Sequence, residues 1–283
     1  MQKAITPRLL KALFRDLVGR RKTTNSSNDI MCHLADLVLG AFFFAMRACE
    51  YSATPKVGRT RRIDMGGLLF RDRKKRPLPL THPRLLDLAE YVTVTFERTK
   101  TAKKRDSRTQ RRTGHRFLCP VLRLASAAQR IIRTYPDWKP NTPLSSSVHD
   151  GRLVDVDSDR IRHTLRQVCK LGGGIEKFGF HPHEIGNKSI RSGAAMALAL
   201  NNHSPYKIMI LGRWESEAFL AYIRPQVLEF ANICSRDMIN FDQFLDVTHR
   251  DPAAPPDQQS RRLTTSFDGL SSTIVLPSFH MSH

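Results

Sequence analysis

The stretch Asn-Lys-Ser-Ile-Arg-Ser-Gly-Ala-Ala-Met-Ala-Leu-Ala-Leu, residues 187–200, and the two segments after it decide the fold of this chain. Residues 204–214 read Ser-Pro-Tyr-Lys-Ile-Met-Ile-Leu-Gly-Arg-Trp, and residues 216–225 read Ser-Glu-Ala-Phe-Leu-Ala-Tyr-Ile-Arg-Pro. Each segment is bounded by residues that favour the ends of helices. The pattern therefore predicts three short helices in a row.

The expected boundaries of these helices follow from capping chemistry. Asn187 can cap the first helix, and Ser204, with proline at the next position, can cap the second. Gly212 is expected to end the second helix, and Ser216 can cap the third. Three residue types then stand out along the series: an arginine beside small residues (Arg191), a Gly-Arg-Trp corner, and a tyrosine near the end.

The charge of the chain points to a polyanionic partner. Its 283 residues include 46 Lys and Arg against 26 Asp and Glu, which gives a formal net charge of +20 and a pI near 10.4. A charge this high causes self-repulsion that bound phosphates would relieve. Nucleic acid is the favoured partner, and an anionic membrane surface is the weaker alternative.

Cysteine and histidine usage gives no sign of a metal or of a disulfide framework. The five cysteines are scattered without a Cys-x-x-Cys pair, and His163, His181 and His183 lack ligand spacing. The apolar run at 37–46 is too short to cross a membrane, and the first residues lack a signal-peptide core. We therefore expect an intracellular protein with no metal, no cofactor and no membrane partner.

The N-terminal half is expected to be helical, with a polar pair at the end of an apolar helix. An amphipathic helix is predicted over residues 7–18, and a more buried one over residues 30–51. The second carries Arg47 and Glu50 near its end. Burying a guanidinium is costly unless it is paired, so a structural Arg–Glu pair at helical spacing is the ordinary interpretation.

The middle of the chain predicts a small sheet between helices. Residues 56–79 are extended, turn-rich and basic, residues 81–90 predict a helical turn or two, and residues 91–97 alternate like a half-buried strand. We expect the return strand at 116–119, after a basic hairpin tip. Helices are predicted over 120–134 and 159–171, with Ser158 as a cap, and a Pro- and Ser-containing loop lies between them. The expected fold class is mainly α with a small antiparallel β-sheet (α+β).

The order of these features resembles the catalytic domain of the tyrosine recombinases (phage integrases), in the eukaryotic, crypton-like branch of mobile elements. The carrying residues are Arg47, Lys100, Arg191 in Lys-Ser-Ile-Arg-Ser-Gly-Ala-Ala, the Gly-Arg-Trp corner and Tyr222. The resemblance covers residues 6–247, and we expect residues 1–247 to form the catalytic domain. Residues 248–283 are rich in Pro, Ser and Thr and predict a disordered tail.

The resemblance implies a role for each matching residue. Tyr222 would be the nucleophile that forms a 3′-phosphotyrosine, while Arg47 and Arg191 would hold the non-bridging phosphate oxygens. Lys100 would protonate the leaving oxygen, with Lys103 as the second choice. Glu50 would orient Arg47.

Two positions depart from the pattern of the family. The second arginine motif is usually His-x-x-Arg, but Lys188 stands where the histidine is expected. A protonated lysine cannot accept the proton of the tyrosine, so His183 is a possible substitute base. The fourth position, nine residues before Tyr222, is Arg213, with Trp214 one residue later, and either could contact the phosphate or support the tyrosine.

Backbone contacts to double-stranded DNA are expected from the basic residues of the turn-rich segment and of the hairpin. These residues are Arg73, Lys74, Lys75, Arg76, Lys103, Lys104, Arg111 and Arg112. The resemblance further implies a homo-oligomer, a tetramer on two DNA sites, and a nuclear location if the host is eukaryotic.

Two alternatives remain open at this stage. The chain begins almost at the catalytic domain, so we expect no N-terminal DNA-clamping domain, and with Lys188 this allows a catalytically impaired DNA-binding relic of a mobile element. A type IB topoisomerase-like DNA relaxase shares the same chemistry. Strand exchange between two duplexes would separate a recombinase from a relaxase.

Overall fold

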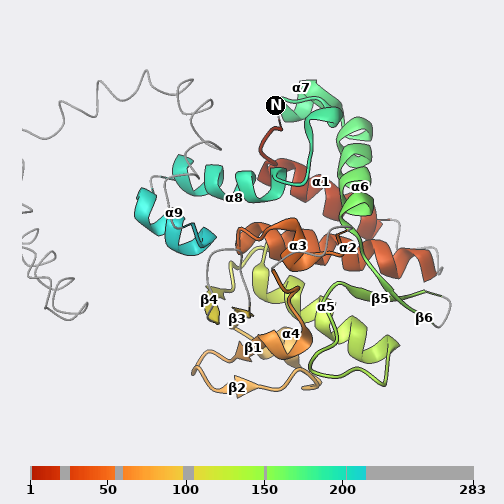
Figure 1. Ribbon diagram of the computed structural model, residues 1–283, viewed down its shortest axis with the longest axis vertical. Helices are drawn as coiled ribbons and strands as arrows, with labels where there is room; N and C mark the ends of the chain where they lie inside the picture. Colours follow the sequence, from red (N-terminus) through yellow and green to blue (C-terminus); the bar gives the residue numbers. More distant parts are fainter. Residues whose placement is uncertain are drawn as a thin grey trace, which may run out of the picture. The chain divides into compact units, whose positions relative to one another are not determined.

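The computed structural model describes residues 2–19, 26–54, 60–97, 105–149, 152–201 and 203–214 (Figure 1). All of them belong to Met1–Leu228, the first of two units into which the chain divides. The predictions for Lys100, Lys103, Lys104, Ser216, Tyr222 and the tail over 248–283 lie outside the described residues.

A long apolar helix is the centre around which the other helices pack. This helix, α2 (Ser26–Phe43), contacts α1 (Pro7–Gly19), α5 (Pro120–Thr134) and α8 (Ser189–Leu200). Leu34, Leu37, Val38 and Leu39 are all buried, so α2 is covered on every side, as an apolar helix must be. The amphipathic helix α1 lies on it and also contacts α6 (Ser158–Leu171).

The expected antiparallel sheet is present, with four strands in the order β2-β1-β3-β4. They are β1 (Leu68–Arg71), β2 (Pro77–Leu78), β3 (Tyr91–Phe96) and β4 (Asp106–Arg111). Val92, Val94 and Phe96 on one face of β3 are buried in the core, whereas Tyr91, Thr93 and Thr95 on the other face are half-buried. The fold class predicted from the sequence, mainly α with a small antiparallel sheet, is confirmed.

The predicted return strand at 116–119 is wrong, because β4 begins ten residues earlier. The register pairs Tyr91 with Arg111 and Phe96 with Asp106. The sequence of β4, Asp-Ser-Arg-Thr-Gln-Arg, has no apolar alternation, so pairing with β3 rather than burial of one face defines it. A second hairpin, β5 (Ser146–His149) and β6 (Arg152–Asp155), lies where a loop was expected.

The predicted helix over 30–51 is interrupted. After α2 ends at Phe43, Ala45 adopts a left-handed conformation (φ 46°), and a new helix α3 (Ala48–Tyr51) begins after Arg47. An alanine in this region is strained, so the surrounding structure must hold it there. This four-residue corner, Phe44–Arg47, organises the candidate site.

Smaller elements complete the described part of the chain. They are α4 (Leu85–Leu88), α7 (Gly174–Phe178), the 3₁₀ turns Met65–Gly67 and Pro182–Glu184, and α9 (Pro205–Gly212). The cap of α6 is Asp157 rather than Ser158, because its carboxylate accepts from the backbone N–H of Arg160 at 2.7 Å. Lys188 rather than Asn187 takes the N-cap position of α8, whereas the cap of α9 is Ser204 as predicted. None of the helices in the described ranges is both long and apolar enough to span a bilayer.

Candidate active site

The corner between α2 and α3 receives two arginines from the C-terminal part of the chain. Arg191, in the first turn of α8, donates from Nη1 to the carbonyl oxygen of Ala45 at 2.8 Å. Arg213, directly after α9, donates from Nη1 to the carbonyl oxygen of Phe44 at 3.0 Å. The reversed backbone at Ala45 leaves successive carbonyl oxygens available to two different guanidinium groups.

Arg47 and Glu50 form the pair that their spacing predicts. Arg47 donates to Glu50 Oε1 from its guanidinium at 3.0 Å and to Oε2 from its backbone N–H at 2.7 Å. The side chain of Glu50 is fully buried, while that of Arg47 keeps 22% of its surface exposed. The carboxylate therefore fixes the start of α3 and leaves part of the Arg47 guanidinium accessible to a ligand.

Arg213 is buried and contacts Glu50 inside the protein. It donates from Nη2 to Glu50 Oε2 at 2.6 Å, and its guanidinium lies 3.6 Å from the centre of the Phe96 ring. Burial lowers the pKa of Arg213, and the adjacent Glu50 carboxylate opposes that shift. With 3% of its side chain exposed, Arg213 is placed to hold the corner and Glu50 rather than to meet a phosphate.

Trp214 covers Arg191. The guanidinium carbon of Arg191 lies 4.2 Å from the centre of the Trp214 ring, and Arg191 Nη2 donates to the carbonyl oxygen of Gly212 at 2.5 Å. A Cβ atom on Gly212 would lie 1.6 Å from the nearest atom of the Trp214 ring, so only glycine allows the ring this position. Gly212 is the last residue of α9, and the left-handed residue that ends the helix is Arg213 (φ 57°).

Lys188 and His183 are both accessible. The side chain of Lys188 is exposed at the start of α8, where its backbone carbonyl accepts from Ser192 Oγ at 2.9 Å. The ring of His183 is exposed and stacks on that of His181 at 5.3 Å, and its carbonyl accepts from Arg166 at 3.0 Å. The described contacts therefore assign His183 to the surface of the 182–184 turn, and no group of three or more His, Cys, Asp or Glu in the described ranges could hold a metal ion.

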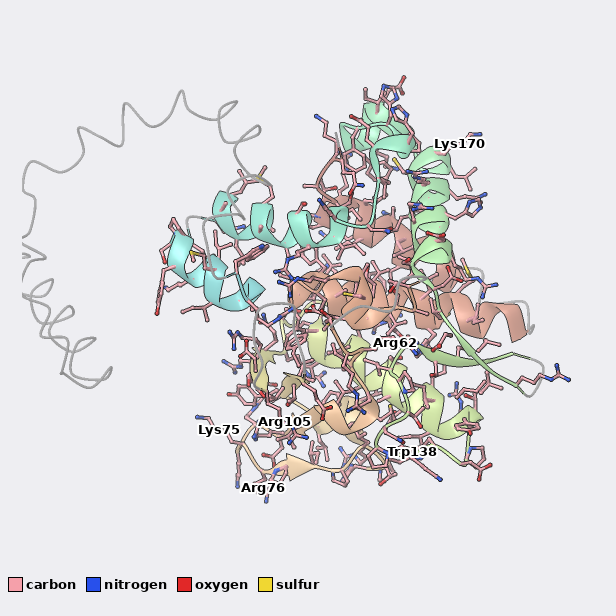
Figure 2. All side chains as sticks on the ribbon, in the orientation of Figure 1. Arg62, Lys75, Arg76, Arg105, Trp138 and Lys170 are labelled. Carbon is pink, nitrogen blue, oxygen red and sulfur yellow. The ribbon has the colours of Figure 1, made fainter. Side chains whose placement is uncertain are left out.

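The basic residues expected to contact DNA fall into two groups. Arg73, Lys74, Lys75 and Arg76 are exposed in the turn between β1 and β2, where Figure 2 labels the last two, and Arg76 Nε pairs with Asp72 at 2.7 Å. Arg111 is the last residue of β4 and Arg112 follows it, so neither lies at the hairpin tip. They are engaged with neighbouring structure: Arg111 with the Glu90 carboxylate, and Arg112 with backbone carbonyls of the α4 region.

Two side chains of β4 that the sequence did not indicate tie the sheet to the helices of the site. Arg108 Nε donates to the carbonyl oxygen of Ile210 in α9 at 2.7 Å, and Gln110 Nε2 donates to that of Phe43 at the end of α2 at 2.9 Å. They were missed because the strand was expected elsewhere. Their alternation on one side of β4 would have been the only local signal.

Comparison with known proteins identifies the fold. No protein-family model matches the sequence, and no curated protein matches it. Two similar solved structures are complexes of the XerH site-specific recombinase: a pre-cleavage complex with difH substrate (TM-score 0.50, 10% identity) and a post-cleavage complex with palindromic difH substrate (TM-score 0.51, 11% identity). Each match covers 83% of this chain but 53% of the recombinase chain, so this chain spans about half the length of its structural neighbours.

The central apolar helix, the small antiparallel sheet and the helices that carry Arg191 and the Gly-Arg-Trp corner therefore belong to one known architecture. The described part of this chain has the fold of the tyrosine recombinases.

Proposed function

We propose that this protein is a DNA strand transferase that cleaves and rejoins DNA through a 3′-phosphotyrosine. The observation that carries the proposal is the corner Phe44–Arg47: it bears Arg47, and its Ala45 carbonyl anchors Arg191, although the two arginines lie far apart in the sequence. Two arginines suit the non-bridging oxygens of a phosphate, because each planar guanidinium can donate two parallel hydrogen bonds to them. The fold similarity to DNA-bound recombinases supports double-stranded DNA as the partner.

In the proposed reaction, the Tyr222 oxygen attacks the scissile phosphate and the bond from phosphorus to the 5′-oxygen breaks. The departing oxygen takes a proton from Lys100, and Arg47 and Arg191 stabilise the charge on the non-bridging oxygens. Rejoining reverses the step with the 5′-hydroxyl of another strand. Because the energy of the broken bond is retained in the phosphotyrosine, no cofactor is needed.

The other residues of the cluster have separate roles in this proposal. Arg213 is a positioning residue, because it holds Glu50, and Glu50 holds Arg47. Trp214 keeps Arg191 covered on one face. Lys188 takes part in phosphate binding, and the proton of Tyr222 leaves to solvent or to a base such as His183.

We test the proposal with a nicked suicide duplex that traps the covalent intermediate, drawn from a library of candidate DNA ends. The expected result is a protein–DNA adduct that survives denaturation and is lost in Tyr222→Phe. Tyr206→Phe is the matched control, because Tyr206 is an exposed tyrosine of α9, and it should still form the adduct. An adduct that persists in Tyr222→Phe would exclude this nucleophile.

The same assay separates the alternatives. Salt-sensitive binding without an adduct would favour a catalytically impaired DNA-binding relic of a mobile element, for which Lys188 in place of histidine is the specific argument. Adduct formation with relaxation of supercoiled DNA but no exchange between duplexes would favour a topoisomerase-like relaxase. We further propose an origin in a eukaryotic crypton-like element, action in the nucleus, and assembly as a tetramer on two DNA sites.

A further inference from the structure

A cavity of about 600 Å³ lies apart from the candidate active site, beside α5. Its walls come from α1, α2, α4, α5 and the segment that follows β4. The volume falls within the range of small-molecule sites, about 300–1,000 Å³. Neither Arg47, Arg191 nor any other member of the active-site cluster lines it.

The cavity is strongly basic. Two aspartates, Asp36 and Asp87, line it, together with five arginines: Arg112, Arg116, Arg123, Arg130 and Arg133. Asp36, 1% exposed, pairs with Arg123 at 3.1 Å and with Arg130 at 3.0 Å. In the described part of the chain, the ion pairs include none with Arg112, Arg116 or Arg133, so an excess of three positive charges faces the cavity.

Guanidinium groups and aromatic rings alternate along one wall, with the two rings tilted by 35° to each other. Arg123 lies 4.3 Å from the centre of the Phe14 ring, the Phe14 and Phe117 rings are 5.0 Å apart, and Arg116 lies 5.3 Å from the Phe117 ring. Such surfaces stack nucleobases, because every base has a flat π face. Leu86 and Leu122 add apolar surface beside the wall.

A donor in this wall lacks an acceptor. The Nε–H of Arg123 is buried and has no hydrogen-bond partner within the described residues. A buried donor left in this state costs about 1–3 kcal/mol, so the Arg123 guanidinium is not fully satisfied by the protein itself. The charge and the aromatic surface together call for an anion that carries a planar ring.

We propose that this cavity binds a nucleotide, with the phosphate on the arginines and the base against the half-buried Phe117 ring. The nucleotide can come from two sources, a free mononucleotide or an unpaired nucleotide at the end of a strand. This site does not depend on the proposed cleavage chemistry.

The test uses isothermal titration calorimetry of the full chain at fixed ionic strength, with AMP, ribose 5-phosphate and inorganic phosphate as probes. AMP should bind most tightly, by about 5- to 150-fold, since stacking of one base contributes about 1–3 kcal/mol. Binding of all three probes with equal, measurable affinity would overturn the assignment of a nucleotide. In Phe117→Leu, the preference for AMP over ribose 5-phosphate should fall.

Reversing the charge of two exposed arginines that line the cavity tests whether the nucleotide binds there. Arg116→Glu/Arg133→Glu changes two exposed residues and should abolish binding. The control, Arg160→Glu/Lys170→Glu, makes the same change in charge on exposed positions of α6, outside the cavity, and should keep it (Lys170 is labelled in Figure 2). Equal loss in both double variants would mean unspecific attraction and would overturn the proposal.

Single-stranded and blunt duplex oligonucleotides distinguish the two sources. If AMP binds to the protein and this binding is lost in Arg116→Glu/Arg133→Glu, the ligand is a free nucleotide. The source is an unpaired nucleotide if AMP does not bind but a duplex with an unpaired end binds more tightly than a blunt one. That preference must also be lost in Arg116→Glu/Arg133→Glu. The absence of both effects overturns the proposal, whatever the suicide substrate shows about Tyr222.

Discussion

Arg213 donates to Glu50 Oε2 at 2.6 Å across 163 positions of sequence, and both side chains are almost wholly buried. The other carboxylate oxygen of Glu50 accepts from Arg47. One buried carboxylate thus joins an arginine that stays inside the protein to an arginine that is partly exposed. Arg213 therefore fixes the position of Arg47 through Glu50, without contacting a substrate itself.

Glu50→Gln should strongly destabilise the protein. Removing one partner of a buried ion pair costs about 3–5 kcal/mol, because the remaining charge stays buried, and here two arginines lose their counter-ion. Urea denaturation measures the effect. Glu97→Gln is the control: Glu97 pairs with Arg61 and Arg105 at the surface and should cost less than about 1 kcal/mol. Equal losses in the two variants would contradict the role assigned to Glu50.

Gly212→Ala should displace Trp214 from Arg191, because the added Cβ would overlap the ring. Trp138 and Trp214 are the two tryptophans of the chain, so the Trp138→Phe background isolates the emission of Trp214. We expect a red shift in Gly212→Ala as the ring becomes more exposed, and slower adduct formation. Gly114→Ala strains a left-handed backbone (φ 76°), but its Cβ would meet nothing within 4 Å, so it should leave the emission of Trp214 unchanged. An unshifted spectrum in Gly212→Ala would show that the ring is not held where we describe it.

Lys188→His should accelerate formation of the covalent adduct near neutral pH. A neutral imidazole can accept the tyrosine proton, and general-base catalysis contributes about 10²–10⁴-fold in rate, so a gain of at least about tenfold is expected. The side chain of Lys188 is exposed, so folding should be little affected. Lys188→Ala serves as the comparison. If the histidine variant were no faster than the alanine variant, the missing base would not be what limits the reaction.

The stability of the protein should fall as the pH drops below about 6.5, owing to His33. Burial and the neighbouring Arg130 lower the pKa of His33 to about 3, although the carbonyl of Leu144 opposes the shift. Between pH 6.5 and about 3 the unfolded chain binds a proton that the folded chain does not, which costs about 1.4 kcal/mol for each pH unit.

His33→Gln isolates this contribution, since an amide can keep the contacts of the ring with Leu144 and Arg130. Asp36, next to Arg130, acts in the opposite direction: burial raises its pKa, so its protonation favours the folded state as the pH falls. The difference between the two proteins removes that common effect. A parallel pH dependence of the free energy of unfolding in both would contradict the prediction.

Lys74→Ala and Arg112→Ala should have different consequences. Lys74 is exposed in the β1–β2 turn, so its loss should reduce the salt dependence of binding to blunt duplex DNA by about 0.9 in the log–log slope. Arg112 donates to the carbonyl oxygens of Ala89 and Leu86, so its loss should lower stability by about 2 kcal/mol. Fluorescence anisotropy measures DNA binding and urea denaturation measures stability. A loss of stability in Lys74→Ala together with a smaller salt dependence but unchanged stability in Arg112→Ala would contradict these two roles.

Local features of the fold were predictable from the sequence, and long-range ones were not. The cap at Ser204 and the Arg47–Glu50 pair depend on residues three positions apart, so both were found. The break at Ala45 was not, because the acceptors that it exposes are used by Arg191 and Arg213 from the other end of the chain. Strand β4 has no apolar alternation and becomes a strand through pairing with β3, a partner that its own residues do not identify.

The corner Phe44–Arg47 also has a consequence for the order of folding. Its two guanidinium partners are 146 and 169 residues downstream, so these contacts close very long loops. Long-range contacts form late, and during synthesis the N-terminal elements emerge first. A nascent chain that has made α2 and α3 must therefore carry Glu50 without Arg213 until residue 213 has been added. The cluster becomes complete only when nearly all of the described chain has left the ribosome, which prevents a partial translation product from presenting it.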